Sequence, residues 1–172
     1  MFRIDLTRID GEPIEFSERV TLPAECGGED VLAPGEATIT GRVEKSEEGY
    51  TVEATVEGRS EVRCVRCLAA FPLTYLERFA VRLCPVAQVP LQEDLHLGPD
   101  ELEVRFLEEP TLDLADLAAE QFQLVLPMKP LCDEKCQGLC SRCGADLNRG
   151  RCACPANVDS RWTPLRAWRS SR

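Results

Sequence analysis

The chain has 172 residues, of which 44% are hydrophobic and 29% charged, and this is the composition of a soluble globular protein of one domain or two small ones. Its net charge of −10 argues against non-specific nucleic-acid binding, because that binding depends on neutralising phosphates with Lys and Arg. No apolar run approaches the roughly 18–20 residues needed to span a bilayer, and the first residues contain no apolar signal-peptide core. We therefore expect a cytoplasmic protein with no membrane partner.

Alternation of apolar and polar residues predicts antiparallel strands over most of the first 110 residues. A polar loop at residues 46–49 separates two such runs and predicts a β-hairpin with one solvated face. Loops are expected at residues 23–36 and 84–100, where glycine, proline and polar residues interrupt the alternation. The apolar positions of the predicted strands are Ala37, Ile39, Gly41, Val43, Tyr50, Val52, Ala54, Val56, Tyr75, Phe79, Val81, Leu83, Leu102, Val104 and Phe106.

One helix is predicted after the strands. Asp113 can cap its first turn, Asp116 places negative charge at the positive end of the helix dipole, and Pro127 ends it. We expect this helix to cover the sheet with one apolar face. The residues expected on that face are Leu114, Leu117, Ala118, Leu124 and Val125.

These elements indicate an α+β fold: a mainly antiparallel β-sheet, sandwich or barrel-like, with one main helix and a C-terminal cysteine-rich zinc knuckle. Residues 1–126 are expected to form the β domain with its covering helix, and residues 127–172 a cysteine-rich zinc-binding segment packed on it, as one structural unit. Charge changes at the same boundary, because the first part has 26 acidic and 11 basic side chains and the second 4 acidic and 9 basic.

Ten cysteines are many for a cytosolic protein, where thiols are kept reduced and disulfides are rare, so metal binding is the default interpretation and the spacing tests it. Eight of them are closely spaced and suffice for two structural zinc sites of four thiolates each. Cys140, Cys143, Cys152 and Cys154 are near enough along the chain to form one small knuckle. The remaining four, Cys64, Cys67, Cys132 and Cys136, would then form a second site that ties the sheet to the C-terminal segment. This pairing follows by elimination, and crossed pairings stay open.

Two other roles for the clustered thiols are less well supported. Cys136, Cys140 and Cys143 have the spacing of the iron–sulfur loop of radical enzymes that use S-adenosylmethionine, but only 29 residues follow, too few for the barrel of those enzymes. A redox role for Cys64 and Cys67 would favour a helix N-terminus, and these cysteines lie among strands. The two remaining cysteines, Cys26 and Cys84, are expected to be solitary buried thiols.

No catalytic constellation is recognisable. The single histidine, His96, falls in a predicted loop without a nameable partner, and we expect it at the surface. There is no glycine-rich phosphate loop and no nucleophile elbow. The sequence therefore predicts a non-enzymatic protein without a small-molecule substrate.

Basic and aromatic residues alternate near the C-terminus. Bases stack on indole rings and arginines bind phosphates, so this group could contact RNA or another partner. Packing of the tryptophans on the domain, with solvated arginines, is an equal alternative. The candidate contact residues are Arg161, Trp162, Arg166, Trp168 and Arg169.

Several segments of the chain, taken together, resemble the bacterial YceD family, which is named for accumulation of large-subunit ribosomal RNA. The resemblance covers about residues 60–168. In chain order the segments are Cys64-Val65-Arg66-Cys67-Leu68, Leu124-x-Leu126-Pro127, Cys132-x3-Cys136-Gln137-Gly138-Leu139-Cys140-x2-Cys143-Gly144-x2-Leu147-Asn148, Cys152-x-Cys154 and Asp159-x-Arg161-x3-Leu165.

The resemblance implies a cytoplasmic, non-enzymatic factor that supports synthesis, processing or accumulation of large-subunit (23S) ribosomal RNA and ribosome assembly. It implies partners among ribosomal RNA, ribosomal proteins or assembly factors. The alternative is a zinc-stapled protein-interaction module with no ribosomal role. Association with large-subunit precursors would separate the two.

Overall fold

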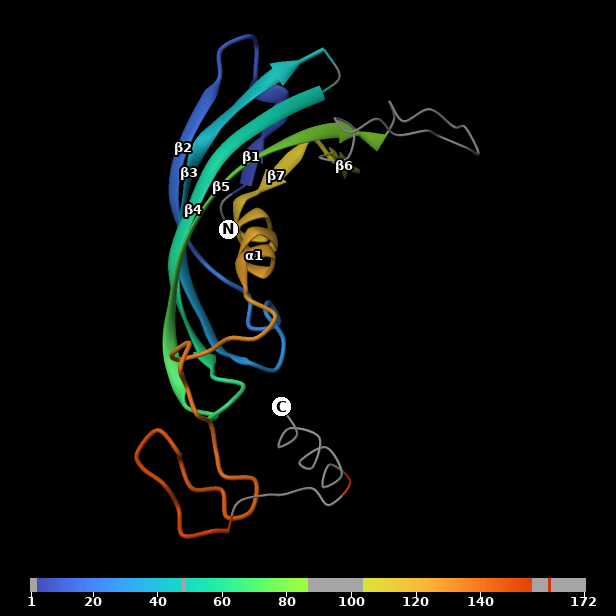
Figure 1. Cartoon of the computed structure of the whole chain (residues 1–172). Helices are drawn as coiled ribbons and strands as arrows, with labels where there is room; N and C mark the ends of the chain where they lie inside the picture. Colours follow the sequence, from blue (N-terminus) through green and yellow to red (C-terminus); the bar gives the residue numbers. More distant parts are fainter. Residues whose placement is uncertain (1–2, 48, 87–103, 156–160, 162–172) are drawn as a thin grey trace, which may run out of the picture.

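The computed structural model describes residues 3–47, 49–86, 104–155 and 161, and within them one curved sheet carries most of the chain (Figure 1). These residues include seven strands and one α-helix, with a short 3-10 turn (Leu6–Arg8) after the first strand. The strands are β1 (Arg3–Asp5), β2 (Ile14–Thr21), β3 (Val31–Ser46), β4 (Gly49–Arg63), β5 (Ala70–Pro85), β6 (Val104–Leu107) and β7 (Thr111–Asp113), and the helix is α1 (Leu114–Val125).

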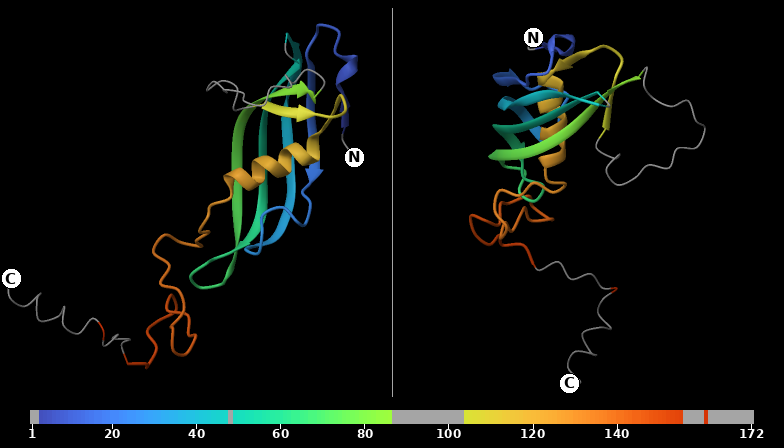
Figure 2. Two further views of the ribbon diagram at one scale, coloured as in Figure 1. Left: turned by 90° about the vertical axis from the view of Figure 1, so that its right-hand side faces the viewer. Right: turned by 90° about the horizontal axis from the view of Figure 1, so that it is seen from above.

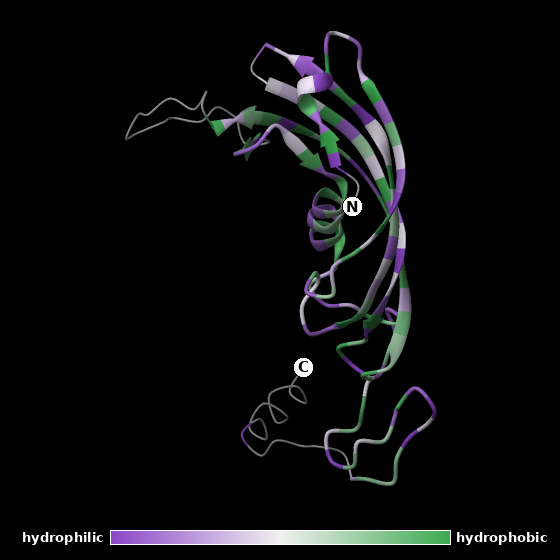
Figure 3. Ribbon diagram, turned by 180° about the vertical axis from the view of Figure 1, so that it is seen from behind, coloured by the Kyte–Doolittle hydropathy of each residue, from purple (hydrophilic) through white to green (hydrophobic). Residues whose placement is uncertain are grey.

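The main sheet has the order β2-β3-β4-β5-β6. Its first four strands pair antiparallel in chain order, whereas β6 adds to β5 in parallel; β1 and β7 form a separate two-stranded sheet. The predicted hairpin is confirmed, because β3 and β4 pair down to Ser46 opposite Gly49. Figure 3 shows the alternation of hydrophobic and hydrophilic residues along the strands that the sequence pattern predicts.

Helix α1 lies on the concave face of this sheet (Figures 1 and 2). Inward-facing residues such as Ile39, Val43, Val52 and Val56 are completely buried and belong to one core cluster that also includes residues of the helix. In the part of the chain that the structure describes, the edge strands β2 and β6 do not pair with each other. The α+β class is therefore confirmed, and the sheet has barrel-like curvature without closure.

The start and end of α1 are as the sequence predicts. The Asp113 side chain accepts hydrogen bonds from the backbone N–H groups of Ala115, at 3.0 Å, and Asp116, at 3.4 Å. The same carboxylate pairs with the Arg3 guanidinium at 3.1 Å, which connects β1 to the helix N-terminus. The cap thus satisfies two amide groups that the helix cannot pair internally.

The predicted buried face of α1 is wrong at one position. Leu124 is 77% exposed, whereas Phe122 is completely buried and its ring centroid lies 5.2 Å from that of Tyr75 on β5. Two residues along a helix correspond to a rotation of about 200°, so Leu124 and Phe122 lie on nearly opposite sides. Phe122 is the residue that packs the helix against the sheet.

The first expected loop is shorter than predicted. Residues 31–36 belong to β3, with register shifts on either side of Ala33, and the second shift covers Pro34. A proline cannot donate to the ladder, and a bulge is where a strand tolerates it. At the other expected loop, β5 continues through Pro85; most of that stretch, including His96, and the strand position Leu102 lie outside the described residues. No helix among the described residues is long and apolar enough to span a bilayer.

Candidate metal centre

Eight cysteines lie in two parts of the chain, the turn between β4 and β5 and the segment that follows α1, which passes the end of the sheet near that turn (Figure 1). They form two groups of four, and within each group the sulfur atoms lie within 4.8 Å of one another. Either group could hold a metal ion. The grouping is the one predicted by elimination from the sequence: a first cluster of Cys64, Cys67, Cys132 and Cys136, and a second cluster of Cys140, Cys143, Cys152 and Cys154.

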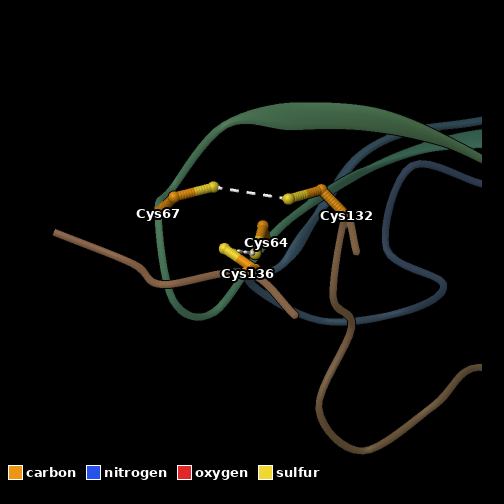
Figure 4. Close-up of side chains that lie close together, drawn as sticks. All are labelled: Cys64, Cys67, Cys132 and Cys136. Carbon is orange, nitrogen blue, oxygen red and sulfur yellow. Dashed lines mark hydrogen bonds between the residues drawn. The ribbon is translucent and has the colours of Figure 1, made fainter. Parts of the chain in front are cut away.

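Two distant segments build the first cluster. Cys64 and Cys67 lie in the turn between β4 and β5. Cys132 and Cys136 lie in the segment that follows α1, and the four side chains point toward one another (Figure 4). The Sγ atoms of Cys67 and Cys132 are 3.6 Å apart. Those of Cys64 and Cys136 are 3.9 Å apart.

These distances fit a tetrahedral metal site. Metal–sulfur bonds of about 2.3 Å place the sulfur atoms of a regular tetrahedron about 3.8 Å apart. A disulfide would need an S–S distance of about 2.05 Å, and all ten cysteines are free thiols. The first cluster therefore has the donors and the spacing that Zn²⁺ favours.

The turn that presents Cys64 and Cys67 has a defined backbone. The Leu68 N–H donates to the Cys64 carbonyl at 2.9 Å, and the Cys64 N–H donates to the Ala69 carbonyl, also at 2.9 Å. Leu68 has a φ of 60°, which makes it the one non-glycine residue among those described with a left-handed backbone. This conformation turns the chain back so that both thiols face the same point.

Thiol pKa values in the first cluster diverge. Burial by itself raises the pKa of the Cys64 thiol, but backbone N–H groups, first that of Cys132 and then that of Cys67, lower it to about 6. The neighbouring Cys67 thiol raises the pKa of Cys132 to about 12. The buried Cys64 is thus the thiol that the backbone prepares as a thiolate, which is the form that binds metal.

The C-terminal segment is fastened to this turn by Arg66. Its guanidinium donates to the carbonyl groups of Cys136, at 2.8 Å, and Glu134, at 3.2 Å. Its own carbonyl accepts from the Leu139 N–H at 3.2 Å. A side chain at Gly138, where φ is +72°, would place its Cβ 2.9 Å from the Arg66 carbonyl oxygen, so this close approach requires glycine.

The second cluster is local and less buried. Cys143 is exposed, and the other three cysteines of the cluster are half-buried. Its first turn repeats the backbone of the first cluster: the Gly144 N–H donates to the Cys140 carbonyl, and the Cys140 N–H to the Ala145 carbonyl, both at 2.8 Å. Here glycine occupies the left-handed position, with a φ of +71°.

The pKa pattern of the first cluster recurs in the second. Backbone N–H groups of Cys143 and Arg142 lower the pKa of the Cys140 thiol to about 6. The Cys143 thiol raises the pKa of Cys154 to about 12. Each Cys-x-Arg-Cys turn therefore favours the thiolate of its first cysteine.

Sequence reasoning missed one residue of the site, Asn148. Its side-chain N–H donates to the Cys136 sulfur at 3.4 Å, and its side-chain oxygen accepts from the Gln137 N–H at 2.7 Å. Asn148 is part of the motif behind the family resemblance, but spacing alone assigned it no role. Its signal was its place in the segment between two cysteine pairs.

The structure separates the cysteines of the iron–sulfur alternative. Cys136 belongs to the first cluster, whereas Cys140 and Cys143 belong to the second. The two solitary thiols stay outside both clusters among the described residues: Cys26 is buried, as expected, and Cys84 is half-buried.

Of the candidate contact residues at the C-terminus, the structure describes one. Arg161 is exposed. Trp162, Arg166, Trp168 and Arg169 lie outside the described residues.

Comparison with known proteins supports the family resemblance. Residues 52–168, which include all eight clustered cysteines, match the family described as Large ribosomal RNA subunit accumulation protein YceD. The chain belongs to the YceD family. No solved structure matches this YceD chain.

Several relatives resemble this YceD chain at modest identity. An uncharacterized protein of Mycobacterium bovis is 29% identical over 168 residues, which is 94% of this chain and 78% of that protein. One of Mycobacterium leprae is 30% identical over 148 residues, or 83% of this chain and 64% of that protein. A chloroplastic protein of Arabidopsis thaliana, named Large ribosomal RNA subunit accumulation protein YCED homolog 1, is 29% identical over 63 residues, or 37% of this chain and 17% of that protein.

Proposed function

We propose that this protein is a non-enzymatic factor that supports synthesis, processing or accumulation of large-subunit (23S) ribosomal RNA and ribosome assembly. The observation that carries the proposal is the family match over residues 52–168, since the family name refers to that accumulation. Its partners would be ribosomal RNA, ribosomal proteins or assembly factors in the cytoplasm. The net charge of −10 favours a basic ribosomal protein as the first contact of the acidic body.

The two cysteine clusters would bind one structural Zn²⁺ each. Four thiolates per site fill a tetrahedral coordination sphere and leave no position for water or substrate, which is typical of structural rather than catalytic zinc. Bound metal would hold the turn after β4 against the segment after α1. The clusters would then contribute to folding and would fix how the C-terminal segment leaves the sheet.

Deletion of the gene tests the ribosomal role. We expect the ratio of large- to small-subunit ribosomal RNA to fall selectively, and the wild-type gene to restore it. A variant with Cys67→Ser and Cys132→Ser should restore it less well, at matched protein level. An unchanged ratio in the deletion strain would contradict the proposal and leave a metal-stapled interaction module.

The C-terminal arginines supply a separate test of contact. Replacing Arg161, Arg166 and Arg169 with Glu should weaken co-sedimentation with large-subunit precursors, because arginine–phosphate contacts would become repulsive. The same charge change at the exposed Arg19, Arg59 and Arg78 on the sheet is the matched control. Equal co-sedimentation of the C-terminal variant and the wild type would exclude these arginines from the contact.

A further inference from the structure

Asn148 lies between the second and third cysteines of the second cluster, yet its side chain contacts the first cluster. Its side-chain nitrogen is 3.4 Å from the Cys136 sulfur, and Cys136 is only 4% exposed. This is a hydrogen bond from one cluster's loop to a candidate ligand of the other. Partners of this kind orient metal ligands and moderate the charge on their sulfur atoms.

The Asn148 amide is held in place on both sides. The Asp146 carboxylate accepts from the Asn148 backbone N–H at 2.9 Å and from its side-chain nitrogen at 2.8 Å. The Asn148 side-chain oxygen accepts from the Gln137 N–H at 2.7 Å. The orientation of the amide, with nitrogen toward the sulfur, is therefore the one that satisfies all of its neighbours.

The backbone around Asn148 continues the connection. The Leu147 N–H donates to the Gly138 carbonyl at 2.9 Å, and Leu139 pairs with Asp146 in an isolated antiparallel bridge. Leu139 in turn donates to Arg66 in the turn of the first cluster at 3.2 Å. The loop of the second cluster is thus hydrogen-bonded, through residues 136–139, to the first.

We propose that Asn148 is a positioning residue that couples the two clusters, so that an ordered second cluster raises the metal affinity of the first. The inference rests on the proposed metal sites. With Cys143 and Cys152 held together, the loop that carries Asn148 is short and its amide stays on the Cys136 sulfur. Without that closure the loop gains freedom and the hydrogen bond loses its preorganisation. The coupling is reciprocal, as binding equilibria require.

The test is a titration of the full chain with Co²⁺. The absorption of thiolate-bound Co²⁺ reports how many thiolates bind the metal at each step. The binding step that Cys67→Ser removes is assigned to the first cluster. Asn148→Asp keeps the acceptor for the Gln137 N–H but loses the donor to sulfur, and Asn148→Ala loses both without adding charge. Arg149→Gln is the matched control, because it changes the charge by the same amount at the adjacent position, and the Arg149 side chain is 89% exposed and pairs with Asp146 at 3.6 Å.

Both Asn148 variants should bind Co²⁺ about 10–100-fold more weakly at the first cluster, with Arg149→Gln near wild type. The variant Cys152→Ser, Cys154→Ser lacks two cysteines of the second cluster. In this variant the first cluster should already bind Co²⁺ more weakly although Asn148 is present, and adding Asn148→Asp should lower the affinity by a smaller factor than in the wild-type chain. Equal affinities of Asn148→Asp and Arg149→Gln, or an Asn148 effect of the same size in both backgrounds, would overturn the coupling.

The metal-site proposal fails separately. If the wild-type chain takes up no Co²⁺ at all, the clusters are not metal sites and the coupling fails with them. If the wild type binds two ions and the variants match it, only the coupling fails. The ribosomal RNA ratio is measured independently of both.

Discussion

Leu68 and Gly144 occupy the same left-handed backbone position in the two Cys-x-Arg-Cys turns, with φ values of 60° and +71°. Each donates its N–H to the carbonyl of the first cysteine, four residues earlier. One turn therefore uses glycine where the backbone requires it, and the other forces leucine into the same conformation. For a residue with a Cβ, this conformation costs roughly 1–2 kcal/mol.

Leu68→Gly should stabilise the folded protein. The relieved backbone strain exceeds the extra entropy of glycine in the unfolded chain, which is about 0.5–1 kcal/mol, so we expect a gain of up to about 1.5 kcal/mol. The leucine side chain is 59% exposed and has little packing to lose. Denaturant unfolding of the metal-loaded protein measures the difference.

The reverse change is the control. A Cβ at Gly144 would meet nothing within 4 Å, so Gly144→Ala should cost the backbone strain of roughly 1–2 kcal/mol less the unfolded-state entropy of about 0.5–1 kcal/mol that glycine loses, a net loss of up to about 1.5 kcal/mol. A loss of stability in Leu68→Gly would contradict the assigned strain. It would mean that the Leu68 side chain makes a stabilising contact instead.

The sequence predicted the hairpin, the helix and its cap, because each depends on residues close together in the chain. Ser46 and Gly49 bracket a short polar turn, and Asp113 caps amides two and three residues on. The cluster grouping was also predictable from local spacing. The four cysteines of the second cluster lie close together along the chain, and the other four paired cysteines were assigned to the first cluster by elimination.

What the sequence did not predict depends on contacts between distant residues. The parallel pairing of β6 with β5 joins strands separated by residues outside the described part of the chain. Phe122 was overlooked in favour of Leu124 because both are apolar, and only the position of the sheet distinguishes them. The hydrogen bond from Asn148 to Cys136 follows from the docking of two loops, which no spacing rule encodes.

Phe122→Ala should be among the most destabilising substitutions of α1. Phe122 is completely buried against Tyr75, and truncation of such a ring typically costs about 3–5 kcal/mol. Because that is a large part of the stability of a small domain, Phe122→Leu should also be measured, with an expected cost smaller than that of Phe122→Ala. Thermal or denaturant unfolding provides the values.

Leu124→Ala is the matched control on the same helix. Leu124 is 77% exposed, so its truncation should change the free energy of unfolding by less than about 0.5 kcal/mol. Equal costs at the two positions would show that the helix packs by a different face.

The charge on Asp113 should make stability depend on pH. Burial by itself raises the pKa of this carboxyl, but hydrogen bonds from Arg3 and from the N–H groups of Ala115 and Asp116 outweigh it and hold the pKa below 3.8. A lowered folded-state pKa means that the carboxylate stabilises the fold above the unfolded pKa of about 3.9. That contribution is lost as pH falls through the folded-state value.

Asp113→Asn isolates this contribution, since asparagine caps a helix about as well but carries no charge. At pH 7 the wild type should be more stable by about 0.3–1 kcal/mol, and the difference should shrink as pH falls below the unfolded pKa of about 3.9 and vanish once pH is below the lowered folded-state pKa. Both proteins carry the same cysteine clusters, so acid effects there cancel in the difference. A difference that does not change with pH would refute the role of the charge.

Metal content should separate the clusters one ion at a time. The wild-type chain is expected to bind two ions, and Cys67→Ser and Cys132→Ser should each bind one, because their sulfur atoms face each other at 3.6 Å in the same cluster. The double variant Cys67→Ser, Cys132→Ser should still bind one ion. The combination Cys67→Ser, Cys152→Ser should bind none, since it removes a ligand from each cluster.

Native mass spectrometry counts the ions, and elemental analysis identifies the metal. Far-ultraviolet circular dichroism shows whether the sheet persists, and the partly exposed Cys67 and Cys132 are chosen because their replacement leaves the core intact. Loss of both ions in the Cys67, Cys132 double variant would mean that these thiols serve different sites and would overturn the grouping. Iron with visible absorbance in place of zinc would keep the grouping and change the chemistry, because four thiolates in a tetrahedron also suit iron.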